Sequence, residues 1–189
     1  MNIMTEDLRN IVLIGMPGSG KSTVGVILAK LTSRNFIDTD VLIQTKQGRS
    51  LQNIVDRQGY LALRAIEERA LLDLNCRDHV IATGGSAVYS QSAMAHLKSS
   101  GIVVFLNVSL DTLISRVHDF ETRGLAKRPD QSMTDLFAER SSLYRQYADI
   151  TIECLTFSHE EVCARIIDEM KRMNRSGRLA MPSSSDECS

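Results

Sequence analysis

The residues from Gly15 to Ser22 follow the pattern Gly-x-x-x-x-Gly-Lys-Ser, directly after an apolar run at 11–14. The glycines of this pattern let the backbone turn several N–H groups into one concavity, where they can meet phosphate oxygens. The Lys21 ammonium group can reach the β- and γ-phosphates, and the Ser22 hydroxyl is the usual ligand of the bridging magnesium ion. Thr23 lies one residue too far along to be as good a metal ligand. The pattern predicts a phosphate-binding loop, the alternative being a glycine-rich turn without a ligand. The residues expected to bind the nucleotide phosphates are Gly15, Gly18, Ser19, Gly20, Lys21, Ser22 and Thr23.

Two carboxylates, Asp38 and Asp40, follow a short strand-like segment one helix length after this loop. In an open parallel sheet, ligands bind beyond the carboxyl ends of the strands. Phosphoryl transfer needs a magnesium ion near Ser22 and a group that orients or deprotonates the incoming hydroxyl. The two carboxylates can divide these tasks, one facing the metal and the other facing the acceptor. The pattern also allows a helix-capping role for Asp40 and a turn role for Asp38.

Two arginines, Arg64 and Arg140, lie among apolar residues of predicted helices, where a purely solvated charge is unexpected. Each guanidinium group could bind a carboxylate in a bidentate manner. A surface salt bridge is the alternative for each, and Glu67 or Glu68 could pair with Arg64. The residues alone therefore predict a nucleotide-dependent kinase that acts on a small, anionic molecule.

Short apolar segments alternate with helix-length segments along the chain, which predicts an α/β protein with a parallel sheet. The predicted strands are 11–14, 35–38, 79–83, 102–107 and 149–154. Predicted helices follow the phosphate loop and cover about 41–75 with breaks near Gly48 and Gly59, 109–118, 135–147 and the segment after Ser158, whose Glu161 completes a capping box. Residues Leu61, Ala65, Glu68 and Leu72 trace the turns of the last helix in 41–75.

One domain, residues 1–171, is expected to hold the whole site. The segment 119–132 has no apolar period and is expected to be a mobile loop within a lid at about 111–132. The helices at about 41–75 would bind the acceptor. After Lys171 the chain becomes polar and small, so we expect 172–189 to be a disordered tail.

Composition excludes several classes of function. The formal net charge of the 189 residues is −1, which gives no general attraction to nucleic acid or to an anionic membrane. The four cysteines are scattered without metal-type spacing, and no apolar stretch approaches membrane-spanning length. The first ten residues lack the layout of a signal peptide. We expect a cytoplasmic monomer whose partners are small molecules.

Several segments, in their order along about 10–170, resemble the shikimate kinase family. They are Gly15–Ser22, Phe36-Ile37-Asp38-Thr39-Asp40, Arg64 with Glu67, Ala82-Thr83-Gly84-Gly85, and Glu139-Arg140 followed by Leu143-Tyr144 and Ala148-Asp149. The resemblance implies a three-layer P-loop fold, related to nucleoside monophosphate kinases, with a five-stranded parallel sheet flanked by helices and a mobile lid. It also implies transfer of the γ-phosphoryl group of ATP, with Mg²⁺, to the 3-hydroxyl of shikimate, a step in aromatic amino acid biosynthesis.

Residue roles follow from the same resemblance. Lys21 would clamp the phosphates, Ser22 and Asp38 would hold the magnesium ion, and Asp40 would bind and activate the acceptor hydroxyl. The resemblance assigns the shikimate carboxylate to Arg64 and Arg140, the ring hydroxyls to backbone groups of Gly84 and Gly85, the adenine to Arg116 and the transferring phosphate to the lid arginine Arg123.

Two positions depart from the family pattern. Ser86 stands where the family has the third glycine of a triplet, and the lid lacks the usual Arg-Pro-Leu-Leu, so Arg128 competes with Arg123 for the lid role. Either departure could alter the acceptor. A gluconate-type or nucleoside monophosphate kinase is therefore an alternative, and a nucleotide-binding regulatory module without transfer activity is another.

Overall fold

Five parallel strands form the centre of the molecule. The computed structural model describes residues 9–116, 124–154 and 157–179. Within those residues the sheet has the order β2-β3-β1-β4-β5, and every neighbouring pair is parallel. The strands are β1 (Asn10–Ile14), β2 (Asn35–Asp38), β3 (His79–Ala82), β4 (Gly101–Asn107) and β5 (Ile150–Glu153). The predicted five-stranded parallel sheet is confirmed, and its strands lie within one or two residues of the expected ranges.

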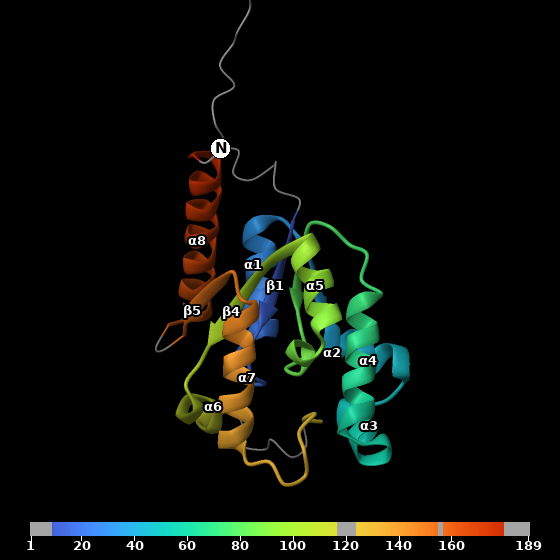
Figure 1. Cartoon of the computed structure of the whole chain (residues 1–189). Helices are drawn as coiled ribbons and strands as arrows, with labels where there is room; N and C mark the ends of the chain where they lie inside the picture. Colours follow the sequence, from blue (N-terminus) through green and yellow to red (C-terminus); the bar gives the residue numbers. More distant parts are fainter. Residues whose placement is uncertain (1–8, 117–123, 155–156, 180–189) are drawn as a thin grey trace, which may run out of the picture.

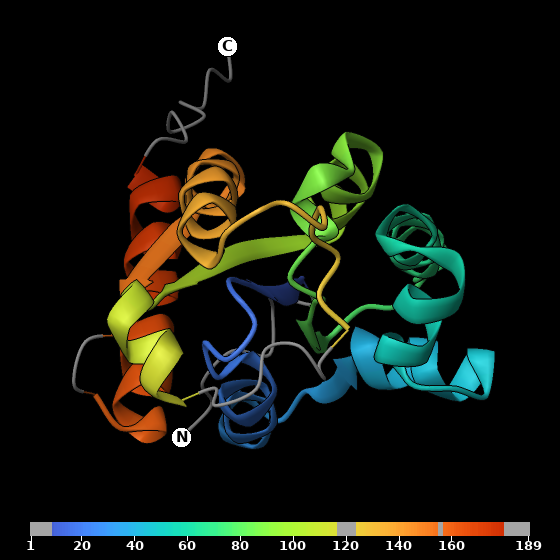
Figure 2. The ribbon, with the colours of Figure 1, turned by 90° about the horizontal axis from the view of Figure 1, so that it is seen from below.

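Helices cover both faces of this sheet. They are α1 (Lys21–Thr32), α2 (Thr39–Gln47), α3 (Leu51–Gln58), α4 (Tyr60–Leu72), α5 (Gln91–Ser100), α6 (Leu110–Arg116), α7 (Met133–Tyr147) and α8 (His159–Leu179), with a short 3₁₀ turn η1 (Ala87–Tyr89). Helices α1 and α8 pack together on one face, and α5 and α7 cover the other (Figure 1, Figure 2). The predicted three-layer α/β architecture is therefore confirmed.

The apolar core explains why the first strand lies at the centre. All five residues of β1 are buried, and so are the five apolar residues of β4 from Ile102 to Leu106. A strand buried on both faces reads as a continuous apolar run, which is the pattern of both segments. Because β1 ends at the phosphate loop, the rigid centre of the sheet supports that loop directly.

A smaller apolar cluster joins the helices beyond β2. Helices α2, α3 and α4 stand beside the sheet (Figure 1) and pack through Ile43, Ile54 and Leu63. Ala126, from the segment that precedes α7, completes this cluster. The segment was predicted to have too little apolar content to be held in place, but Leu125 and Ala126 are buried. Residues 124–126 of the expected lid therefore pack against helices α2, α3 and α4.

Helix α8 is longer than predicted. It begins after Ser158, whose hydroxyl accepts from the Glu161 N–H while the Glu161 carboxylate accepts from the Ser158 N–H, so the predicted capping box is present. The helix then continues to Leu179, beyond the expected end at Lys171. No proline lies between Lys171 and Pro182, and Lys and Arg are good helix formers. The expected tail therefore begins too early at 172, and residues 180–189 lie outside the described part.

Candidate active site

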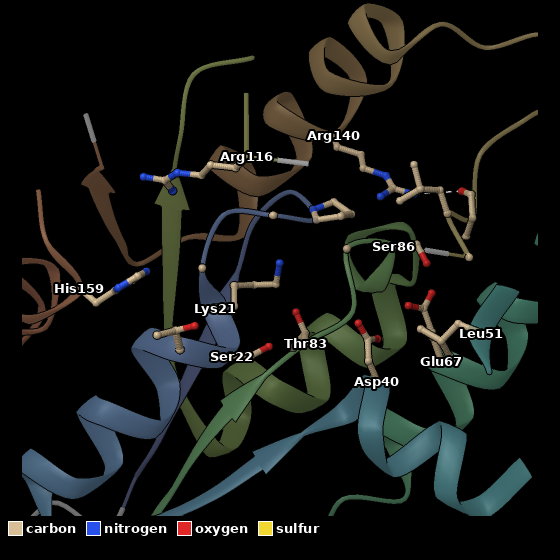
Figure 3. Close-up of a pocket in the computed structure, with 18 residues that line it drawn as sticks. Lys21, Ser22, Asp40, Leu51, Glu67, Thr83, Ser86, Arg116, Arg140 and His159 are labelled. Carbon is tan, nitrogen blue, oxygen red and sulfur yellow. Dashed lines mark hydrogen bonds between the residues drawn. The ribbon is translucent and has the colours of Figure 1, made fainter. Parts of the chain in front are cut away.

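A cavity of about 610 Å³ opens where the loops after β1 and β3 meet the first turns of α1 and α2. Its lining extends from Arg116 and His159 at one end to Glu67 and Arg140 at the other, with Lys21 between them (Figure 3). This location is the carboxyl edge of the sheet, where ligands of open α/β proteins bind. We call the first end the nucleotide end and the second the acceptor end.

The phosphate loop forms one wall of the nucleotide end. Gly18 and Gly20 adopt φ angles of 84° and 91°, which favour glycine, and Gly20 caps the N-terminus of α1. Five of the predicted phosphate-binding residues line the cavity: Gly18, Gly20, Lys21, Ser22 and Thr23. The other two, Gly15 and Ser19, lie behind this wall and contact the Lys21 ammonium group.

The Lys21 ammonium group is buried in the loop. It donates to the carbonyl oxygens of Gly15 and Met16 at 2.8 and 2.9 Å, with the Ser19 hydroxyl at 3.5 Å. Burial lowers the pKa of Lys21 to about 8, although the carboxylates of Asp40 and Asp38 act in the opposite direction. The loop thus holds a cation beside the cavity that phosphate oxygens can reach.

Ser22 and Asp38 are in direct contact. The Ser22 hydroxyl donates to Asp38 Oδ2 at 2.6 Å, and Asp38 Oδ1 accepts from the backbone N–H groups of Asp40 and Val41. Asp38 is therefore the N-cap of α2, whereas the capping alternative had assigned that role to Asp40. The cap orients one carboxylate oxygen toward Ser22. A hydroxyl and a carboxylate oxygen so placed fit a hard divalent cation such as Mg²⁺.

Asp40 begins the acceptor end, at the first turn of α2. Its Oδ1 is buried and has no hydrogen-bond partner among the described residues. Burial raises the pKa of Asp40, the Lys21 ammonium group opposes this, and Asp38 adds to it. A carboxylate with a raised pKa is a better proton acceptor near neutral pH than an exposed one.

Glu67 was not predicted as a site residue, yet it lines the cavity beside Asp40. The sequence suggested a salt-bridge partner for Arg64, but Glu67 is only 5% exposed, and burial, with Asp40 nearby, raises its pKa to about 8. The face of α4 had been traced through Leu61 and Leu72, which are 64% and 42% exposed. The buried face instead contains Leu63, Glu67, Ala70 and Leu71, and this helical spacing is the signal that could have identified Glu67.

Gly84 makes room for the two carboxyl groups. A Cβ atom at this position would overlap the Glu67 carboxyl group and lie 2.8 Å from Asp40 Oδ1. The Gly84 N–H donates to Thr39 Oγ1 at 3.0 Å, and its carbonyl accepts from the Ala87 N–H. The backbone of Gly84 is thus engaged within the protein and does not line the cavity, whereas Gly85 does.

Arg64 and Arg140 converge from two separate helices. Both donate to the carbonyl oxygen of Ala126, at 3.0 and 2.9 Å, and their guanidinium carbons lie 3.5 and 5.4 Å from the centre of the Tyr89 ring. Among the described residues neither forms an ion pair, and Glu68 instead accepts from Ser90 and Ser92. Arg140 is 1% exposed. Because a buried cation without an ion pair is costly, this pair predicts an anionic ligand.

The nucleotide end includes one more residue that the sequence did not reveal. His159 lines the cavity beside Gly20, and Arg116, predicted from the resemblance, lies at the same end (Figure 3). The sequence analysis did not identify His159 because it directly follows the capping Ser158. Nothing in the local pattern distinguishes it from an ordinary residue at the start of a helix. Arg123 lies outside the described residues. Arg128, the other candidate for the lid arginine, does not line the cavity. Its Nη1 lies 3.4 Å from Glu139 Oε2.

The phosphate loop, the parallel sheet and the facing carboxylates and arginines define a P-loop kinase of a small molecule. A family model described as shikimate kinase matches residues 17–171. The chain belongs to the shikimate kinase family. A shikimate kinase from Sulfurihydrogenibium sp. is 35% identical over 166 residues, which cover 87% of this chain and 99% of that protein.

Solved structures agree with this assignment. A shikimate kinase from Acinetobacter baumannii in complex with shikimate has a TM-score of 0.82 at 33% identity and covers 89% of this chain and 96% of its own. A gluconokinase from Sinorhizobium meliloti 1021 reaches a TM-score of 0.50 at 22% identity, covers 91% of this chain and 97% of its own, and shows only the shared fold. The expected family and fold are therefore confirmed.

Proposed function

We propose that the protein transfers the γ-phosphoryl group of ATP to the 3-hydroxyl of shikimate. One observation carries the proposal: the cavity that begins at the phosphate loop ends at Arg140, with Asp40 between, and Arg64 donates to the same carbonyl oxygen as Arg140. Such a site suits a nucleotide and a hydroxylated carboxylate placed end to end. The A. baumannii relative, whose structure contains shikimate, supports the same acceptor.

The chemistry uses residues on both sides of the reacting atoms. The oxygen of the acceptor hydroxyl forms a bond to the γ-phosphorus while the bond from that phosphorus to the bridging oxygen of ADP breaks. Asp40 orients the hydroxyl and takes its proton, a task favoured by its raised pKa. Lys21 exchanges its carbonyl partners for phosphate oxygens and stabilises their charge. Arg64 and Arg140 hold the acceptor carboxylate.

The nucleotide would extend past Ser22 and Thr23 toward Arg116, which we assign to the adenine. We assign Arg123 to the phosphates during transfer. Ser22 and Asp38 would hold a magnesium ion, which when bound neutralises phosphate charge. No group of three or more His, Cys, Asp and Glu side chains in the described part could hold a metal by itself, so phosphate and water must complete this site.

We also propose that the enzyme works as a monomer in the cytoplasm. The residues of both cavity ends come from one chain, so a second copy is not needed to build the site. Cys76, Cys154 and Cys163 are free thiols, which suits a reducing compartment. None of the helices in the described ranges is long and apolar enough to cross a bilayer.

An ATP-coupled assay of ADP release tests the function. Purified protein with Mg²⁺ is offered shikimate, gluconate or a nucleoside monophosphate, and a reaction without acceptor reports background ATP hydrolysis. We expect turnover with shikimate and a phosphorylated product at its 3-hydroxyl. Turnover with gluconate or a monophosphate but not with shikimate would contradict the assigned acceptor. ATP binding without turnover on any acceptor would instead indicate a regulatory module.

A further inference from the structure

The Ser86 hydroxyl is a buried polar group that the proposed reaction does not yet use. Ser86 is 5% exposed and lines the cavity, and its Oγ has no hydrogen-bond partner among the described residues. In Figure 3 the side chain lies in the acceptor half of the cavity with Glu67 and Arg140. Because buried hydroxyls are nearly always hydrogen-bonded, an unpartnered one on a cavity wall indicates a ligand contact.

A purely structural role for this serine does not fit its geometry. Ser86 is the N-cap residue of η1, a position where serine usually accepts a hydrogen bond from the following backbone, yet its side chain makes no such bond. Its φ of −98° is one that any residue adopts. Position 86 therefore does not need glycine for its backbone conformation, and the serine side chain is not needed to cap the turn.

The neighbours of Ser86 indicate which part of the acceptor it meets. Ser86 also lines a second cavity, of about 710 Å³, whose wall includes Arg64 and Tyr89. The Tyr89 ring, in the same short turn, lies beside the Arg64 and Arg140 guanidinium groups. Gly85, the residue before Ser86, also lies close to Arg140, because a Cβ atom on Gly85 would lie 2.9 Å from Arg140 Nη1. The hydroxyl is thus on the segment that adjoins both cations.

From this arrangement we infer that the Ser86 hydroxyl donates a hydrogen bond to the carboxylate of the acceptor and adds to its selection by Arg64 and Arg140. The inference rests on the proposed function, since it takes shikimate as the acceptor. A hydrogen bond to a charged group contributes more than one between neutral groups, so loss of this one should be measurable in KM.

Ser86→Ala is the direct test because alanine tolerates the same backbone conformation. We expect the KM for shikimate to rise about tenfold, with the KM for ATP and kcat changed less than about twofold. Ser86→Gly should show a similar loss, since it too lacks the hydroxyl. Ser141→Ala is the matched control: Ser141 Oγ is also buried without a described partner, but Ser141 lines neither cavity.

A shikimate analogue without the carboxylate identifies the contacted group. On that analogue Ser86→Ala and wild type should have similar KM values, because the contact is absent from both. An equal loss on both compounds would place the hydroxyl at the ring and overturn the inference, as would an unchanged KM for shikimate or a Ser86→Gly variant that binds shikimate better than wild type. If wild type itself fails to phosphorylate shikimate, the proposed function falls, and this assignment with it. A failure confined to the variants leaves that function intact.

Discussion

The two ends of the cavity are built in different ways. The nucleotide end rests on one contiguous loop, in which the buried Lys21 ammonium group already has carbonyl partners only five and six residues away. The acceptor end combines α2, α4, α7 and the turn after β3, and its buried polar atoms lack partners in the described part: Asp40 Oδ1, Glu67 Oε2, Ser86 Oγ and the Nε atoms of Arg64 and Arg140.

This difference shows which end is internally complete. Unpaired buried polar groups cost free energy, and where several of them gather at one site a ligand can pair with them. The Lys21 ammonium group is satisfied by carbonyl groups of its own loop, so the loop can hold this cation without a nucleotide. The acceptor end is satisfied only when an acceptor supplies the missing partners. We therefore expect variants at the two ends to separate nucleotide binding from acceptor use.

The largest expected effect is at Asp40. Asp40→Asn removes the group that takes the hydroxyl proton, so kcat should fall by about 10²- to 10⁴-fold. The Kd of ATP should change less than about twofold, since the nucleotide end is built separately. The assay of ADP release gives kcat, and calorimetry gives the Kd of ATP. Asp73→Asn, at the exposed end of α4, is the control. A near-normal kcat would remove Asp40 from the chemistry.

Lys21→Met should impair the nucleotide end. Methionine keeps a long apolar side chain in this buried position but cannot donate to phosphate oxygens, so kcat/KM for ATP should fall by about 10²- to 10³-fold. Binding of shikimate in the absence of nucleotide, measured by calorimetry, should be preserved. If acceptor binding were lost to the same degree in a folded variant, the two ends would not be independent, and the comparison would be wrong.

Arg64→Ala has a smaller effect, confined to acceptor binding. It deletes a charge-assisted contact of about 1.5 to 3 kcal/mol, so the KM for shikimate should rise roughly 10- to 100-fold. The kcat and the KM for ATP should change little. Arg69→Ala is the matched control, because Arg69 lies on the same helix but is exposed and lines neither the main cavity nor the second cavity to which Arg64 contributes. An unchanged KM for shikimate would show that Arg140 alone holds the carboxylate.

The smallest effect concerns stability and its pH dependence. The pKa of Glu67 is about 8 in the folded protein against 4.5 normally, so folding favours its protonated form. Its stabilising contribution is fully present below about pH 4.5 and is lost as the pH rises through about 8. Glu67→Gln cannot ionise, so its Tm relative to wild type should increase by several degrees between about pH 5 and pH 8.5.

Calorimetry of both proteins over this pH range gives the difference in Tm. The other ionisable groups are common to the two proteins, so the difference isolates Glu67. A Tm difference that stays constant with pH would mean that Glu67 is not a buried carboxyl group. The acceptor end would then be less strained without its ligand than we infer.

Much of the nucleotide end could be predicted from the sequence. The pattern from Gly15 to Ser22 depends on residues next to one another, and glycines at positive φ carry the same meaning in any fold. The contact of Ser22 with Asp38 followed from the rule that strand ends of a parallel sheet share an edge. The alternation of strands and helices predicted the sheet for the same reason, since periodicity is a local property.

The acceptor end could be predicted only in part. Asp40, Arg64 and Arg140 were named as candidates, but the salt-bridge alternative for Arg64 was equally consistent with the sequence. The contact that decides between the readings joins Arg64 to Ala126, 62 residues away in the chain. The burial of Glu67 was missed because a glutamate on a helix is usually exposed, and only packing against α2 and the turn after β3 encloses it.

The sequence by itself determined the succession of strands and helices along the chain, the phosphate loop with its lysine, and the capping box before α8, because each depends on neighbouring residues and backbone geometry. Only the tertiary structure decided that Asp38 and not Asp40 caps α2, that Arg64 and Arg140 meet at one carbonyl, and that the Ser86 hydroxyl has no internal partner. These features depend on which distant segments enclose a polar group. Burial, which sets the cost of an unpaired charge or hydroxyl, is a property of the packed molecule and not of any one segment.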